Sequence, residues 1–160
     1  HSPAYEPQLR YLLAWCRLRL HAIDKASAGW LSVAADRVYG ASAKRLVESL
    51  REFRGETQAS PATAGVLAAV LPGAGFWYLD RRRDAGLAFI LNAGFIVASL
   101  VALQGGNYAL GALLLLIESG WYSGNILASI SAVHRQNRRR LEQFIVGLQA
   151  GHGLLLAFDS

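Results

Sequence analysis

The feature that most constrains this chain is a long stretch without charge. Between Ala85 and Val133, Glu118 carries the only ionisable carboxylate or amine. Two apolar segments, 85–103 with 19 residues and 108–133 with 26, lie on either side of the polar turn "QGGN". About 20 apolar helical residues are enough to cross the ~30 Å hydrocarbon core of a bilayer. The pattern therefore predicts two helices that span a membrane.

A third charge-free segment comes earlier in the chain. Residues 61–79, "PATAGVLAAVLPGAGFWYL", are 19 in number and long enough to span. Pro72 followed by Gly73 should kink a helix at this point. We predict three spanning helices, with the alternative that only two span and that residues 61–79 form a broken or re-entrant element. The predicted fold class is an all-α integral membrane helical bundle.

The first sixty residues have an ordinary charge balance, with nine Lys or Arg and six Asp or Glu. Apolar residues at helical spacing predict three short helices at about 8–21, 25–35 and 41–53, and short connections make neighbouring helices antiparallel. The residues expected to face the core are Leu9, Leu12, Leu13, Cys16 and Leu20 in the first helix, Ala26, Trp30 and Val33 in the second, and Leu46, Val47, Leu50 and Phe53 in the third. Asp24 is a candidate N-cap for the second helix. This part is expected to be a small extramembrane helical unit, residues 1–60.

The last part of the chain combines a basic start with an apolar face. After the arginines of residues 135–140, apolar side chains recur at helical spacing at Leu141, Phe144, Ile145 and Leu148. Such a segment is typical of an amphipathic helix in the membrane interface, and the alternative is a helix packed on the protein's own bundle. The expected organisation is thus 1–60, a transmembrane bundle at 61–134, and a basic flank with an amphipathic helix at 135–160.

Arginine clusters flank the apolar segments and account for much of the net charge of +5. The residues are Arg81, Arg82, Arg83, Arg138, Arg139 and Arg140. Basic loops stay on the cytoplasmic side of a membrane and attract anionic lipid headgroups. We therefore predict an inner-membrane protein with cytoplasmic basic loops, a periplasmic N-terminal part and membrane lipids as partners. No interleaved aromatic and basic motif indicates nucleic-acid binding.

Three polar side chains lie within the apolar segments, namely Asn92, Glu118 and Asn125. A carboxylate near mid-membrane costs several kcal/mol unless it is paired or protonated. We expect these side chains to form one polar cluster inside the bundle. Its functional reading is a proton or ion site, or contact with a partner's charge, and the alternative is interhelical hydrogen bonding that only holds helices together.

Small residues recur every four positions in two of the apolar segments. They are Gly65, Ala69 and Gly73 in the first, and Gly120, Gly124 and Ala128 in the last. Such stripes let helices approach closely. They predict tight packing between spans or against another subunit. That subunit could be a second copy of this chain, so a homo-oligomer is one of the predicted arrangements.

Residue types that carry enzyme chemistry lack the required spacing. Cys16 is the only cysteine, so it has no intramolecular disulfide partner, and it is expected to be a small buried residue. His134 and His152 have no second ligand at metal-binding spacing, and the serines of the last apolar segment have no obvious base. We predict no catalytic, metal-binding or cofactor-binding residue and no enzymatic activity.

The segment "PGAGFWYLDRRRDAGLAFIL" carries a resemblance to known proteins. Its motif residues are Pro72, Gly73, Gly75, Tyr78 and Leu79, followed by Asp84, Ala85 and Gly86. It resembles the two-transmembrane-segment domain family of small bacterial membrane proteins. Phe76 stands where the family usually has Gln, and Asp80 where it has Gly. The resemblance implies membrane architecture more than a particular activity.

The N-terminal part resembles a degenerate tetratricopeptide-like unit. The matching residues are Ala26 and Trp30 in the second helix, and the helix that restarts after Tyr39–Gly40. The resemblance implies a protein-binding module, and a plain three-helix unit is the alternative. Together these features predict a non-enzymatic membrane-anchored scaffold or accessory subunit that binds a protein partner in a cell-envelope complex. The alternative is a subunit of a transport or channel assembly that uses Glu118.

Overall fold

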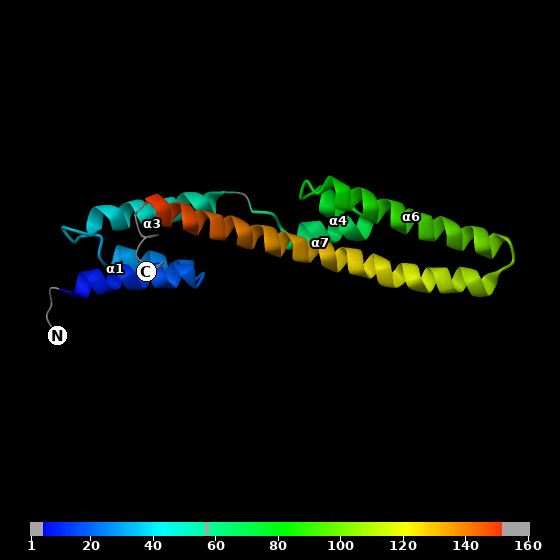
Figure 1. Cartoon of the computed structure of the whole chain (residues 1–160), viewed down its shortest axis with the longest axis horizontal. Coiled ribbons are helices and arrows are strands. Elements are labelled where there is room, and N and C mark those ends of the chain that lie inside the picture. The colour runs from blue at the N-terminus through cyan, green and yellow to red at the C-terminus, as the bar shows by residue number, and fades with distance from the viewer. Residues whose placement is uncertain (1–4, 57, 152–160) are drawn as a thin grey trace. The chain divides into compact units, whose positions relative to one another are not determined.

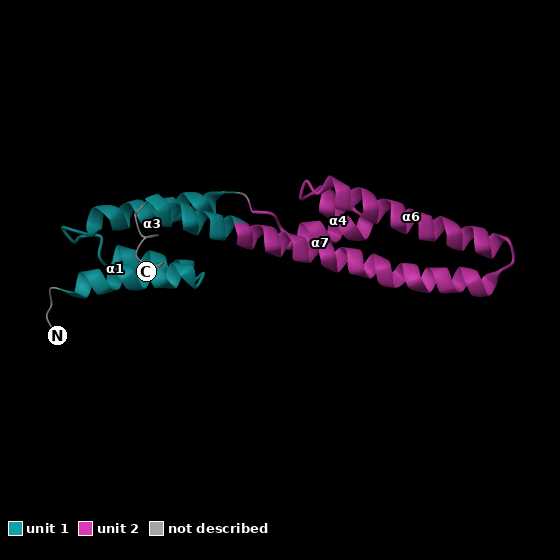
Figure 2. Ribbon diagram, viewed as in Figure 1, with its two compact units in different colours: residues 1–57, 140–160 teal, residues 58–139 magenta. Residues whose placement is uncertain are grey.

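The computed structural model describes residues 5–56 and 58–151, and these residues are all-α, as expected (Figure 1). They form seven helices and no strand. The helices are α1 (Glu6–Arg19), α2 (Ile23–Leu31), α3 (Gly40–Gly55), α4 (Pro61–Val70), α5 (Ala74–Trp77), α6 (Arg82–Gln104) and α7 (Tyr108–Gly151). Figure 2 shows two compact units: unit 1 comprises residues 1–57 with 140–160, and unit 2 comprises residues 58–139.

The core of unit 1 is built on aromatic side chains from α1 and α2. Trp15 and Trp30 are both 0% exposed, and their rings meet edge to face with centroids 5.1 Å apart. Such a pair contributes about 0.5–1.5 kcal/mol beyond its buried area. Tyr11 and Tyr39 add a second ring contact, also with centroids 5.1 Å apart. Tyr11, Trp15 and Trp30 are buried in the core of unit 1, and Tyr39 packs against that core while partly buried.

The inward faces of α2 and α3 are those expected from the spacing of their apolar residues. Ala26, Trp30 and Val33 are buried in α2, and Leu46, Leu50 and Phe53 in α3, with Val47 half-buried. The expected cap of α2 is wrong. The N-cap position is Ala22, and Asp24 lies inside the first turn, where its carboxylate pairs with Arg54 of α3.

The expected inward face of α1 is also wrong. Tyr11, Ala14, Trp15 and Leu18 are buried, whereas the five residues expected in the core are exposed. Those exposed residues are Leu9, Leu12, Leu13, Cys16 and Leu20. The physical reason is the close approach of α1 and α2, since a Cβ atom on Gly29 would lie only 2.9 Å from the Cβ of Ala14. Helix α1 is apolar on more than one side, and the side that carries the small Ala14 side chain can approach α2 most closely.

The last turns of α7 complete the core of unit 1. Ile145 is buried there, and the ring of Phe144 stacks on that of Phe53 with centroids 4.3 Å apart. Arg140 also pairs with Glu56, at 3.2 Å between Nη2 and Oε2. Residues 135–151 therefore continue α7 without a break, and the apolar face of this segment packs on the protein's own helices. This packing agrees with the alternative expectation of a helix packed on the protein's own bundle. The described residues of the segment expected as a separate part at 135–160 instead belong to α7.

Residues 61–79 do not form a spanning helix. α4 has 10 residues, about 15 Å of helix. Leu71 is then extended, with φ −141° and ψ 119°, and Gly73 turns the chain into α5 with φ +90°. The expectation of three continuous spans is therefore wrong, and the segment is the broken element that the alternative named.

Two helices of the described residues are long and apolar enough to cross a membrane. They are α6, with 23 residues, and α7, with 44. Both helices enter unit 2, where the turn at 105–107 joins them (Figure 1). The count of two rests on the length and composition of the helices.

Candidate functional site

The centre of unit 2 is a corner in which α4, α5 and the start of α6 approach closely. A Cβ atom on Gly73 would lie 2.3 Å from the carbonyl oxygen of Ala85, and one on Gly75 would lie 2.5 Å from that of Ala64. Gly73 also has φ +90°, a conformation that glycine adopts without steric cost. The glycines of the P-G-x-G motif are thus required by the backbone packing of this corner.

The middle of α7 holds the corner in place. Phe76 and Leu79 pack in one core with Ala132 and Val133 of α7. The hydroxyl of Tyr122 on α7 also donates a hydrogen bond to a carbonyl oxygen of α4, at 2.9 Å. The start of α6 and this part of α7 therefore lie at the same end of unit 2.

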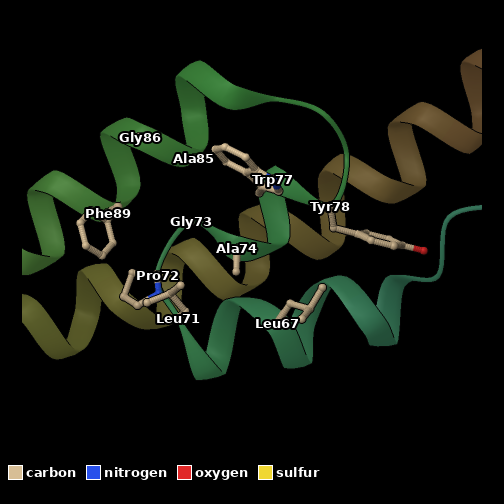
Figure 3. A pocket seen from close by; sticks show the side chains of 10 residues that line it. All are labelled: Leu67, Leu71, Pro72, Gly73, Ala74, Trp77, Tyr78, Ala85, Gly86 and Phe89. Atoms are coloured by element: carbon tan, nitrogen blue, oxygen red, sulfur yellow. The ribbon is translucent and has the colours of Figure 1, made fainter.

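An apolar groove opens on the corner between α4, α5 and α6 (Figure 3). Its volume is about 640 Å³. The lining residues are Leu67, Leu71, Pro72, Gly73, Ala74, Trp77, Tyr78, Ala85, Gly86 and Phe89. The side-chain hydroxyl among them, on Tyr78, accepts a hydrogen bond from the Ser60 amide at 3.1 Å. The groove therefore presents a hydrocarbon surface, which the sequence analysis missed because it arises only when the chain folds back at Gly73.

The arginines of residues 81–83 lie beside this groove. Arg82 lies over the ring of Trp77, with its guanidinium carbon 5.9 Å from the ring centroid. Arg82 pairs with Asp80 at 3.0 Å, and Arg81 pairs with Asp84 at 2.7 Å. Exposed pairs of this kind contribute about 0–1 kcal/mol each. Within the described part of the chain, Arg83 has no ion-pair partner.

The expected polar cluster of Asn92, Glu118 and Asn125 is only partly assembled. Asn92 is 0% exposed, and its amide donates to the Ala88 carbonyl of its own helix at 2.6 Å. Glu118 is 5% exposed, and neither of its carboxylate oxygens has a hydrogen-bond partner among the described residues. The Asn125 amide nitrogen lacks one there as well. The structure buries the first two residues and shows no hydrogen bond that joins the three.

The two stripes of small residues have different surroundings. In the first, Gly73 meets Ala85, and a Cβ on Gly65 would come 3.0 Å from the Ile130 side chain. In the second, Ala128 packs on the core of unit 2, but a Cβ on Gly120 or Gly124 would meet no atom of the described residues within 4 Å. The first stripe is thus used inside unit 2, and the G-x-x-x-G of α7 faces open space.

Metal-binding geometry is not found within residues 5–56 and 58–151, which contain no group of three or more His, Cys, Asp or Glu that could hold an ion. His134 is exposed on α7, and His152 lies outside the described residues. Cys16 is exposed on α1, so its expected burial is wrong.

Comparisons with protein-family models, with curated proteins and with solved structures found no match to this chain. The two family resemblances suggested by the sequence accordingly stay predictions.

We expect Gly73→Ala to lower the stability of unit 2 more than Gly86→Ala does. The first change forces an L side chain to a positive φ and into the Ala85 carbonyl, which should cost about 1–3 kcal/mol. The second places its Cβ in open space on a helix, where Ala is favoured over Gly by up to about 1 kcal/mol. Thermal unfolding of the detergent-solubilised protein, followed by circular dichroism, measures both. Equal melting temperatures would contradict the packing described for the corner.

Proposed function

We propose that the protein is a non-enzymatic, membrane-anchored scaffold or accessory subunit that binds a partner protein. The anchor is the hairpin of α6 and α7. Its support is the length and apolar composition of the two helices and the exposure of large apolar side chains along them. Examples are Ile90 at 67%, Val101 at 63% and Leu116 at 70%. Exposed apolar surfaces on long helices are compatible with the hydrocarbon interior of a bilayer. The short α4–α5 element enters the membrane and returns without crossing it.

The packing of unit 1 sets the orientation of this anchor. Unit 1 contains residues that precede α4 together with residues 140–151 at the end of α7. These two segments share one core, so they lie on the same side of the membrane. The arginines at 138–140 then lie on that side too. The proposed orientation therefore differs from the sequence expectation, which put the N-terminal part in the periplasm and the basic loops in the cytoplasm. By the positive-inside rule, unit 1 is cytoplasmic.

The observation that carries the scaffold proposal is the apolar outer face of α1. Leu9 is 63% exposed, Leu13 48% and Leu20 78%, and Leu12 and Cys16 lie between them. Residues at this spacing share one side of a helix, the arrangement by which a helix binds an apolar groove in another protein. Unit 1 already has a complete core in Trp15 and Trp30. The α1 face is therefore available to a partner.

The test is to extract the full chain gently from its native membrane and identify co-purifying proteins by mass spectrometry. We expect a stoichiometric partner that is retained by the wild type and lost from Leu13→Glu. An exposed position tolerates this change within about 0.5 kcal/mol of stability, whereas a charge in an apolar contact weakens binding by at least about tenfold.

The matched control is Val146→Glu, which alters a side chain on α7 that is 54% exposed. It should keep the partner. Retention by Leu13→Glu, or equal loss from both variants, would contradict the role of the α1 face. A protein purified without any partner would contradict the scaffold proposal itself.

A second candidate function is a subunit of a transport or channel assembly. The observation that favours it is Glu118, a buried carboxylate with no hydrogen-bond partner among the described residues and placed within the apolar part of α7. An ionisable group at membrane depth commonly marks a proton or ion path. Asn92 is buried in α6, and both residues lie within the helices proposed to span.

Glu118→Gln separates the two candidates, with the exposed Glu142→Gln on the same helix as its control. Under the scaffold proposal, both variants fold and retain the partner, and vesicles that hold the wild type keep an imposed pH gradient. A gradient that the wild type dissipates, and that is preserved only by Glu118→Gln, would favour transport. Loss of assembly in Glu118→Gln would show that the charge itself is paired.

A further inference from the structure

We propose that the apolar groove of unit 2 binds an acyl chain of an anionic phospholipid, with the phosphate of the headgroup at Arg82 and Arg83. This inference rests on the proposed membrane anchor. It goes beyond that anchor because it assigns a specific lipid site to one corner of the protein. A generic lipid-facing surface would select neither the position nor the headgroup.

The lining of the groove fits hydrocarbon. Its volume of about 640 Å³ falls within the roughly 300–1,000 Å³ of small-molecule sites. A polar ligand would need several convergent donors and acceptors, whereas the polar side-chain groups of the lining are only the Trp77 indole N–H and the Tyr78 hydroxyl, whose oxygen accepts from the Ser60 amide. Trp77 and Phe89 present apolar rings toward the space (Figure 3). Burial of each methylene there contributes about 0.8 kcal/mol.

The basic residues beside the groove favour a lipid with a negatively charged headgroup. Trp77 lines the groove and also lies under the guanidinium of Arg82, 5.9 Å from the ring centroid. One side chain therefore joins the apolar surface to a positive charge. Arg83 follows directly and has no ion-pair partner among the described residues. A chain in the groove would then bring its phosphate to these two residues, as at the membrane interface where tryptophan and arginine commonly lie.

Further positive charge lies at the same end of unit 2. Residues 80–84 carry three arginines and two aspartates, so the loop keeps a net charge of +1 despite its ion pairs. Val133 packs in the core of the corner, and Arg135, Arg138 and Arg139 follow it within two turns of α7. Each basic residue near a membrane surface contributes about 1 kcal/mol of attraction to anionic lipid. A zwitterionic lipid would gain little from this arrangement.

The test uses fluorescence quenching in the full chain, and Trp77 is the reporter. Trp15 and Trp30 are buried in unit 1, and Trp121→Phe removes the indole that is exposed on α7. The delipidated protein in mild detergent is titrated with phosphatidylglycerol or phosphatidylcholine, each brominated on the same acyl chains. We expect saturable quenching at lower concentrations of phosphatidylglycerol, and reversal by unbrominated phosphatidylglycerol.

Two glycines of α6 provide a matched pair of variants. A Cβ on Gly86 or Gly94 would meet no described atom within 4 Å, but only Gly86 lines the groove. Gly86→Phe fills the groove and should weaken the apparent affinity for brominated phosphatidylglycerol by about tenfold, whereas Gly94→Phe should leave it unchanged. Arg82→Gln leaves the groove open and should weaken it by about fivefold. If Gly86→Phe does not fold, Arg82→Gln still tests the lipid site through its effect on the affinity for phosphatidylglycerol.

Three results would overturn the lipid site. They are quenching that does not saturate, equal affinity for the two headgroups, and equal affinity of the two glycine variants. Extraction of membranes with alkaline carbonate beforehand separates this failure from that of the anchor. Protein released by carbonate would overturn the membrane proposal and the lipid site together, whereas protein retained in the membrane with any of the three results would overturn only the lipid site.

Discussion

The packing of the end of α7 on α1, α2 and α3 is the interaction on which the rest of the account depends. Phe144 stacks on Phe53, and Ile145 is buried in the same core as Trp15 and Trp30. This contact makes one unit from residues that are far apart in the sequence. It also requires the chain to leave unit 1, pass through α4, α5 and α6, and return along α7. For the proposed membrane anchor, this path implies an even number of crossings, because α4 with 10 residues is too short to add a third.

The second constraint is the corner at Gly73 and Gly75. Backbone carbonyl oxygens occupy the space that side chains at these positions would need, so the chain can turn sharply between α4 and α6. The turn leaves an apolar groove beside the arginines of residues 81–83. The same local packing thus explains the motif and the broken helix, and it forms the surface that we assign to a lipid.

Much of this architecture could be predicted from composition, and the rest could not for identifiable reasons. Hydropathy was sufficient to predict α6 and the first part of α7, because long segments that are almost free of charge are typical of membrane-spanning helices. The inward face of α1 could not be predicted, because Leu9 and Leu13 lie on one apolar side and Trp15 on another, and only the contact with Gly29 selects between them. The continuation of α7 past Arg138 was missed because the arginines of residues 135–140 were taken to mark the end of the transmembrane bundle. Yet residues 125–146 contain no Gly or Pro to end a helix. For the candidate site, the close packing at Gly73 was expected from the stripe of small residues to which it belongs, whereas the groove depends on contacts between three helices.

The most direct test of the central claim is the side of the membrane on which Cys16 lies. It is the only cysteine and is exposed on α1, so a membrane-impermeant maleimide can report its location in bacterial cells that produce the full chain. Gly105→Cys in a Cys16→Ser background reports the turn between α6 and α7. We predict that Cys16 is labelled only after the inner membrane is permeabilised, and that the thiol introduced at position 105 is labelled while that membrane is intact. Labelling of Cys16 across an intact inner membrane would contradict a cytoplasmic unit 1 in which α1, α2 and α3 share a core with the end of α7.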